Sequence, residues 1–162
     1  MKNIKGAVKM PSCTHQAGVN VPIGEIWNFV SDIGNWAPLV PGYITHEVLS
    51  DKESTWSFKS DMGILKKKIE LKVDITSWQE PTKVTFNLTG LNERFTGHGY
   101  FLAAKGSNNR NLMTGALDIK AEGMMAKVAN SLLNTSLPEI TAELTEAVAA
   151  KLEQEYKEHA GV

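Results

Sequence analysis

The last quarter of the chain, from about Met124 to His159, constrains its fold more than any other segment. Apolar residues recur there every three or four positions, which places them on one stripe of an α-helix. That stripe comprises Leu133, Leu137, Ile140, Leu144, Val148, Leu152 and Tyr156. A long helix with one apolar stripe needs another element to cover it, because helical stability in water comes mostly from packing.

The segment from Tyr43 to Ala121 has a different period. Apolar and polar residues alternate there in runs separated by turn residues, which is typical of consecutive antiparallel strands. We expect strands at Tyr43–Leu49, Thr55–Ser60, around Ile69–Ile75, around Val84–Thr89, at Phe95–Ala104 and at Leu112–Ala121. The alternation predicts that Ile69, Leu71, Phe86 and Leu88 face the long helix, and that Lys68, Lys72, Thr85 and Asn87 face solvent.

The segment before Tyr43 predicts a further strand and two short helices. Ser12–Val21 has the pattern of a strand, and Pro22 suits the first turn of a helix that buries Ile26 and Trp27. Ser31 and Asp32 are typical caps for a second short helix. A sheet and a helix that each have one apolar face can bury both faces by packing against one another. We therefore expect an α+β fold, with a sheet curled around the last helix.

Composition limits the class of protein. The 162 residues are expected to form one domain, 1–162, with residues 1–11 extended or disordered before it. The net charge is -1, so nucleic acid is not an expected partner. Cys13 is the single cysteine, which fits a reducing compartment. The start of the chain lacks the apolar run of a signal peptide, and we expect a cytoplasmic protein.

Candidate catalytic and metal-binding residues are few. The four histidines lie on different predicted elements without paired spacing, so neither a metal site nor a cofactor is expected. Cys13 and His15 share a strand face, which fits either an activated thiol or an inert buried cysteine. Glu93, Arg94 and His98 fit either acid–base chemistry or a solvated loop with a strand end.

Three further features have both a structural and a functional interpretation. The strand glycines fit either close approach of another group or tolerated surface positions; they are Gly90, Gly97, Gly99 and Gly115. The basic stripe of Lys66, Lys67, Lys68 and Lys72 fits either a solvated strand or peripheral contact with anionic lipid. Pro138 lies inside the last helix and predicts a kink near residues 134 to 138.

Several segments resemble a known superfamily over about residues 12 to 155. Val19–Trp27 resembles the strand end and first helix of the helix-grip superfamily, which includes START, birch-pollen-allergen-like and polyketide-cyclase-like proteins (SRPBCC). Pro41–Tyr43, Lys59–Lys66 and Gly123–Ala126 are similar to motifs of the CoxG-like proteins, which are associated with carbon monoxide dehydrogenase. Tyr43 stands where that subgroup has cysteine, and Ile64 where it usually has proline.

The resemblance implies a fold and a class of function. The fold would be a curved seven-stranded antiparallel sheet around a long C-terminal helix, with two short helices between strands 1 and 2. The function would be non-enzymatic carriage of a lipid, isoprenoid or quinone, serving a molybdenum hydroxylase-type dehydrogenase. Two alternatives remain open: a cyclase or dehydratase enzyme, and an assembly or chaperone-like protein that offers a surface to a partner.

The predicted site is an apolar cavity between the sheet and the last helix. Methionines near the helix start suit ligands of varied shape, although they also fill ordinary cores. The predicted lining is Trp36, Val40, Phe58, Ile69, Leu71, Phe86, Leu88, Phe95, Met124, Met125, Val128 and Leu132.

Overall fold

The computed structural model describes residues 12–60, 67–106 and 110–160. Residues 1–11, Ile64, Lys66 and the loop at 107–109 lie outside these ranges, so the expectations that concern them stay predictions. Two short helices and a 3-10 turn follow the first strand: β1 Ser12–Val19, α1 Ile23–Val30, α2 Ile33–Trp36 and η1 Ala37–Leu39. Six strands and one helix complete the order: β2 Tyr43–Val48, β3 Glu53–Lys59, β4 Lys68–Gln79, β5 Lys83–Gly90, β6 Phe95–Lys105, β7 Asn111–Ala121 and α3 Ala126–Ala160.

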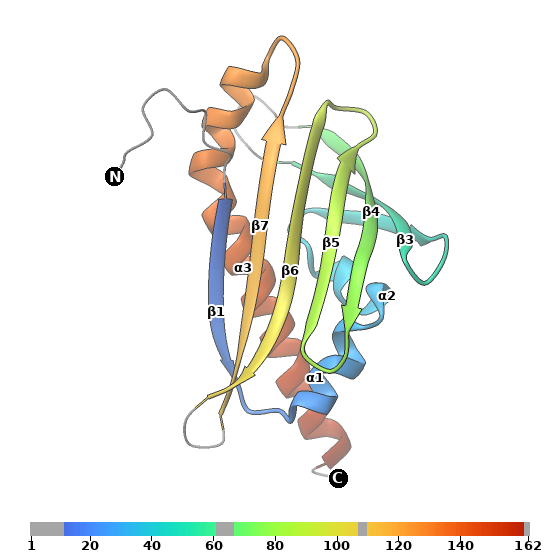
Figure 1. Cartoon of the computed structure of the whole chain (residues 1–162), viewed down its shortest axis with the longest axis vertical. Helices are drawn as coiled ribbons and strands as arrows, with labels where there is room; N and C mark the ends of the chain where they lie inside the picture. The colour runs from blue at the N-terminus through green and yellow to red at the C-terminus, as the bar shows by residue number, and fades with distance from the viewer. Residues whose placement is uncertain (1–11, 61–66, 107–109, 161–162) are drawn as a thin grey trace.

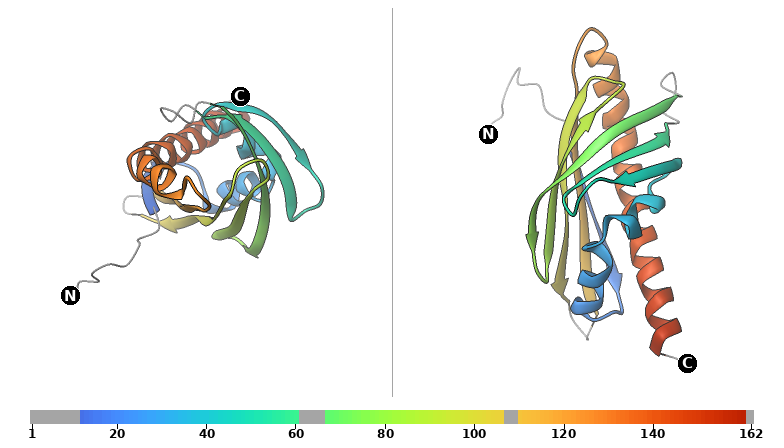
Figure 2. Two further views of the ribbon diagram at one scale, coloured as in Figure 1. Left: turned by 90° about the horizontal axis from the view of Figure 1, so that it is seen from above. Right: turned by 90° about the vertical axis from the view of Figure 1, so that its right-hand side faces the viewer.

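All seven strands form one antiparallel sheet in the order β1-β7-β6-β5-β4-β3-β2. Strands β2 to β7 form a meander, and β1 joins it beside β7 (Figure 1). Seen from above, the sheet curves around α3 and the short helices (Figure 2). This architecture confirms the predicted fold, in which a curved sheet holds a long C-terminal helix.

The predicted elements differ from the observed ones only at their ends. β1 ends at Val19 rather than Val21, because Asn20 to Pro22 lead directly into α1. Pro22 is the N-cap of α1, and its carbonyl accepts hydrogen bonds from the Glu25 and Ile26 N–H groups. The predicted cap of α2 is also present, since the Asp32 carboxylate accepts a hydrogen bond from Gly34 N–H at 3.0 Å.

The predicted sheet faces are confirmed. Ile69, Leu71, Phe86 and Leu88 are buried, whereas Lys68 and Asn87 are exposed and Lys72 and Thr85 are half-buried. The α3 stripe faces β1 and β7: it is buried at Leu133, Leu137, Leu144, Val148 and Leu152 and half-buried at Ile140 and Tyr156.

Two of the strand glycines lie where other groups approach the backbone. A Cβ at Gly99 would lie 2.8 Å from the Phe86 ring, and one at Gly115 would lie 2.2 Å from Thr145 Oγ1 of α3. These positions support the close-approach interpretation of the glycines.

The long helix runs without interruption through Pro138. A proline N cannot donate to the carbonyl of residue 134, one turn earlier. The helix is therefore not divided by a loop, and the kink near residues 134 to 138 stays a prediction.

Candidate functional site

The interior between α3, the short helices and the sheet is filled by aromatic side chains. Trp36 lies at the centre, with ring centroids 5.2 Å from Trp56, 5.5 Å from Phe86 and 5.0 Å from Phe101. Both tryptophan N–H groups have acceptors: Trp36 Nε1 donates to the Val30 carbonyl, and Trp56 Nε1 donates to Ser54 Oγ. Beside this cluster, a void bounded by Phe101, Gly115 and Thr141 has a volume of only ≈ 10 Å³.

The predicted lining residues fall into three groups by exposure. Trp36, Ile69, Leu71, Phe86 and Leu88 are buried; Val40, Phe58, Phe95 and Leu132 are half-buried; Met124, Met125 and Val128 are exposed. The centre of the predicted cavity is therefore packed, and its space lies at one end of the sheet.

Met124, Met125 and Val128 are exposed rather than buried between the sheet and α3, and their place in the ligand site stays a prediction. Met124 and Met125 precede the first residue of α3, so they occupy a turn. Val128 is five residues before Leu133, which turns it about 140° around the helix from the buried stripe. Leu132 is half-buried at the edge of that stripe.

These exposed residues belong to an apolar rim at the end of the sheet where β5 ends and β6 begins. We define the rim as Leu91, Met124, Met125 and Val128. The β5–β6 loop and the start of α3 lie at the same end of the molecule (Figure 1). An open hollow of ≈ 350 Å³ beside the rim is lined by residues 89–96 and Glu122. Four of the seven exposed large apolar side chains in the described ranges are therefore at this end.

Hydrogen bonds hold the rim together. Asn130 of α3 accepts from Ala121 N–H at 2.8 Å and donates to the Ala121 carbonyl at 3.1 Å, which fixes the helix start to the end of β7. The Arg94 carbonyl accepts from Glu122 N–H at 2.9 Å. Asn92 accepts from Glu70 N–H and donates to the Lys68 carbonyl, which ties the β5–β6 loop to the start of β4. The rim is therefore built on anchored backbone.

The described lysines of the basic stripe form ion pairs. Lys67 Nζ lies 2.8 Å from Glu93, and Lys68 Nζ lies 3.3 Å from Glu70. Lys72 Nζ lies 3.2 Å from Asp74, and hydrogen bonding to that carboxylate raises the pKa of Lys72 above its ordinary value. Pairing reduces the charge available for an anionic lipid surface.

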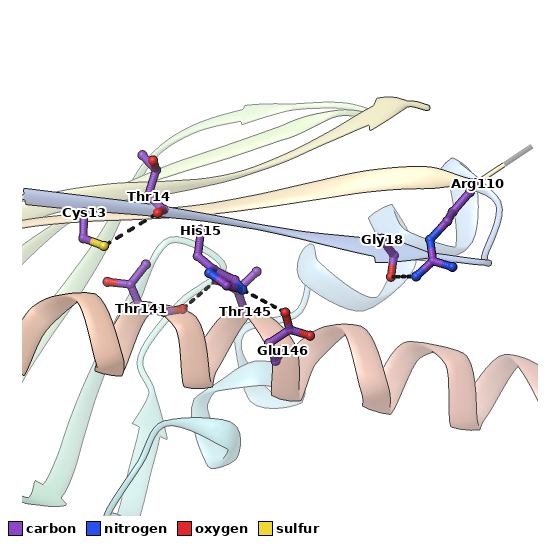
Figure 3. Close-up of polar contacts among 8 residues, drawn as sticks. All are labelled: Cys13, Thr14, His15, Gly18, Arg110, Thr141, Thr145 and Glu146. Atoms are coloured by element: carbon purple, nitrogen blue, oxygen red, sulfur yellow. Dashed lines mark hydrogen bonds and ion pairs between the residues drawn. The ribbon is translucent and has the colours of Figure 1, made fainter. Parts of the chain in front are cut away.

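Cys13 and His15 share a face of β1, as the sequence predicted, and both point toward α3, but no hydrogen bond joins them. His15 Nε2 lies 2.8 Å from Glu146 Oε2, whereas Cys13 Sγ has the Thr14 carbonyl at 3.6 Å (Figure 3). The histidine therefore joins β1 to α3 and does not act as a base for the thiol.

The acid–base candidates Glu93, Arg94 and His98 do not converge. Glu93 pairs with Lys67 at the rim. His98 Nε2 lies 2.8 Å from Asp118, and both belong to the sheet face opposite the buried Gly99 and Leu117. Among the described residues, no three His, Cys, Asp or Glu side chains are grouped for metal binding.

A polar pair at the inner face of β2 was missed by sequence reasoning. Tyr43 Oη and His46 Nδ1 lie 2.7 Å apart, at hydrogen-bond distance. Residues three apart on a regular strand point to opposite faces, but the pairing of β2 with β3 shifts register between Tyr43 and Thr45. This irregularity lets the two side chains meet. The contact cannot be predicted from the alternation of apolar and polar residues in the sequence.

In the described ranges, no helix combines the length and the apolar character needed to cross a membrane.

Comparisons with known proteins agree with this geometry. A protein-family model matches residues 10–155. No curated protein matches the sequence at a significant level. Among solved structures, the chain is similar to the Zhui aromatase/cyclase of Streptomyces sp. R1128, with a TM-score of 0.74 and 14% identity over 95% of this chain and 100% of that one.

Two further solved structures have the same fold. A START superfamily protein from Mycobacterium smegmatis gives a TM-score of 0.67 at 15% identity, covering 89% of this chain and 98% of that chain. Ara h 8.0201 gives 0.59 at 11% identity, covering 88% and 97%.

Proposed function

We propose that this chain, which belongs to the helix-grip superfamily of START, birch-pollen-allergen-like and SRPBCC proteins, binds a hydrophobic or amphipathic small molecule at the apolar rim. The observation that carries the proposal is the exposure of Leu91, Met124, Met125 and Val128 at one end of the molecule, where Leu91 and Phe95 are the apolar residues that line an open hollow. Ligands bind in concave sites with mostly apolar linings and a few polar groups.

The packing of the aromatic cluster supports binding at the rim. The void that Phe86 and Phe101 border has a volume of ≈ 10 Å³, which is room for no more than one water-sized group. At the rim, apolar side chains are exposed and available for contact. Covering apolar surface contributes about 25 cal/mol per Å² before the cost of association.

The chemical class of the ligand and the partner enzyme of this protein are also part of the proposal. A lipid, isoprenoid or quinone suits an apolar rim with flexible methionines. Delivery to a molybdenum hydroxylase-type dehydrogenase is the role that the resemblance to CoxG-like proteins implies. Peripheral contact with membrane lipid would provide access to such a ligand, although Lys67 and Lys68 of the basic stripe are paired.

One observation favours each alternative function. A cyclase or dehydratase would require a proton-transfer group, and the Tyr43–His46 pair lies on the inner face of β2. An assembly protein would require an exposed apolar surface, and Ile44, Val48 and Leu49 provide one along the edge strand. Small-molecule binding at the rim requires neither the Tyr43–His46 pair nor this exposed surface.

The proposal predicts that Met125→Glu lowers the affinity for an apolar ligand about tenfold, because a carboxylate beside the ligand must lose hydration. The measurement is fluorescence titration with 2-isopropenylnaphthalene, a neutral hydrocarbon. Met125 is 59% exposed, so the thermal midpoint should change little.

Val48→Glu provides the matched control, since Val48 is 51% exposed and lies at the end of β2, before the β2–β3 turn. This variant should bind the probe as the unmodified protein does. Equal affinity in all three proteins would exclude the rim as the binding site. Native mass spectrometry of protein purified from its own host would identify a co-purifying ligand.

A further inference from the structure

β2 is an open edge of the sheet. It is the last strand in the order of the seven, and among the described residues only β3 pairs with it. Leu49 N–H donates to the Glu53 carbonyl, so the backbone groups of Leu49 face β3. The direction of these groups alternates along an antiparallel strand, so those of Glu47 also face β3, whereas those of His46 and Val48 face the open edge. An edge with unpaired N–H and carbonyl groups can pair with a strand of another chain.

The side chains of β2 do not protect this edge. Proteins commonly protect an open edge with lysine, proline or a covering helix. β2 contains no lysine, arginine or proline, whereas β1, the other edge strand, lies against α3. Although α2 and η1 contact β2, Ile44 and Val48 of this strand are 48% and 51% exposed. The register shift is confined to the start of the strand, and Thr45 to Val48 pair regularly with β3. This edge is therefore suited to pairing with another chain.

We propose that β2 pairs antiparallel with β2 of a second copy of this chain, and so joins the sheets of a twofold-symmetric dimer. The sequence of the strand selects one register. A dimer axis beside Glu47 would place the two Glu47 carboxylates opposite one another, and like charges there destabilise the pair. An axis beside Thr45 would leave Val48 outside the paired strands.

An axis beside His46 avoids both problems. Glu47 of each copy then lies opposite Thr45 of the other, whose hydroxyl can donate to the carboxylate. Ile44 of each copy lies opposite Val48 of the other, which pairs apolar side chains that are exposed in the single chain. The strand therefore complements a second copy of itself in charge and in apolar contact.

The interface of this dimer is small. The two His46 residues form its central pair, and each ring is at hydrogen-bond distance from Tyr43 of its own chain. The strand has six residues, which places the contact among weak, transient interfaces that bury less than about 1,200 Å². Association should therefore be reversible and depend on concentration. The contact uses no residue of the rim, so it is independent of the proposed function.

The test reverses the charge at one exposed position of β2. Sedimentation velocity of the whole chain at concentrations up to about 1 mM, where weak complexes form, measures the dimer affinity. Thr45→Glu should lower this affinity about tenfold, because each new carboxylate lies opposite Glu47. Thr45→Lys should raise it about threefold, because each new ammonium group lies opposite that carboxylate. Val48→Pro removes an N–H that faces the open edge and should also weaken the dimer.

Thr14→Glu and Thr14→Lys are the matched controls, because Thr14 is an exposed threonine of β1, the other edge strand. They change the net charge as the Thr45 variants do and should leave the dimer affinity unchanged. A chain that sediments as a monomer at every concentration overturns the proposal. So does a dimer whose affinity changes in the same direction in both Thr45 variants, stays constant in both, or responds equally to the Thr14 variants. Titration with 2-isopropenylnaphthalene tests the rim separately, so either proposal can fail while the other stands.

Discussion

Glycines at the buried face of the sheet set how closely neighbouring groups pack. Gly115 of β7 lies directly against Thr145, one of the two buried threonines of α3. Thr145 Oγ1 also donates to the Thr141 carbonyl at 2.7 Å, so this hydroxyl is held in place. Helix and strand can therefore approach one another here only because residue 115 has no side chain.

This contact predicts that Gly115→Ala destabilises the protein by about 1–3 kcal/mol, because the new Cβ would overlap Thr145 Oγ1. Thr145→Ala alone should cost about 1 kcal/mol through its lost hydrogen bond. The double variant should cost less than the sum of the two single variants. Urea unfolding of the four proteins measures the coupling.

Gly24→Ala is a control for glycine replacement in general. Nothing lies within 4 Å of a Cβ at Gly24, which is in α1, so alanine there should stabilise by about 0.5–1 kcal/mol. Additive effects of the Gly115 and Thr145 substitutions would contradict the close-approach explanation.

Single residues show which features of the structure could be predicted from the sequence and which could not. The inward faces of β4 and β5 could be predicted because alternation is regular over Ile69 to Ile75 and Val84 to Leu88. The Tyr43–His46 contact could not be predicted, because a register shift brings the two side chains together. The lack of a hydrogen-bond partner for the Ser60 hydroxyl within the described ranges could not be predicted either, because it depends on the positions of all the groups around it.

At the scale of elements, α3 combines a packed stripe with an anchored start. Its stripe was predictable from spacing, since helical periodicity extends from Leu133 to Tyr156. The exposure of Met124, Met125 and Val128 was not predictable, because single apolar residues also occur on the surfaces of folded proteins. The Asn130 contacts decide where the start of the helix lies.

These contacts predict that Asn130→Ala destabilises the protein by about 1–3 kcal/mol, because the buried Ala121 N–H and carbonyl lose their partner. Amide hydrogen exchange at Ala121 and in the first turns of α3 should become faster. Asn134→Ala is the control on an exposed position one turn later. Unchanged exchange in Asn130→Ala would mean that other contacts hold the helix start.

At the scale of the whole molecule, the sheet curves around α3 and the short helices (Figure 2). Aromatic rings pack together between these elements, and an open hollow lies at one end of the sheet. The order of elements was predictable, because each period change in the sequence marks a change from helix to strand. The filling of the centre was not, because Trp36, Trp56, Phe86 and Phe101 meet from elements far apart in the chain. This arrangement supports the proposal that a ligand binds at the rim, where substitutions need not disturb the core.

The whole-molecule arrangement predicts that Val128→Trp separates binding from stability. Val128 is exposed at the rim, so an indole there should extend over the hollow and lower the affinity for 2-isopropenylnaphthalene about tenfold. Stability should change by less than about 0.5 kcal/mol, because no core side chain must move. Thermal melts and fluorescence titration of the same samples measure the two effects.

Ala150→Trp adds the same ring to an exposed position near the other end of α3 and should leave binding unchanged. If Val128→Trp binds the probe with the affinity of the unmodified protein, the ligand does not bind next to Val128. If it lowers stability as an overpacked core would, by about 1–3 kcal/mol, then Val128 is part of the packing and the rim is not an open binding surface.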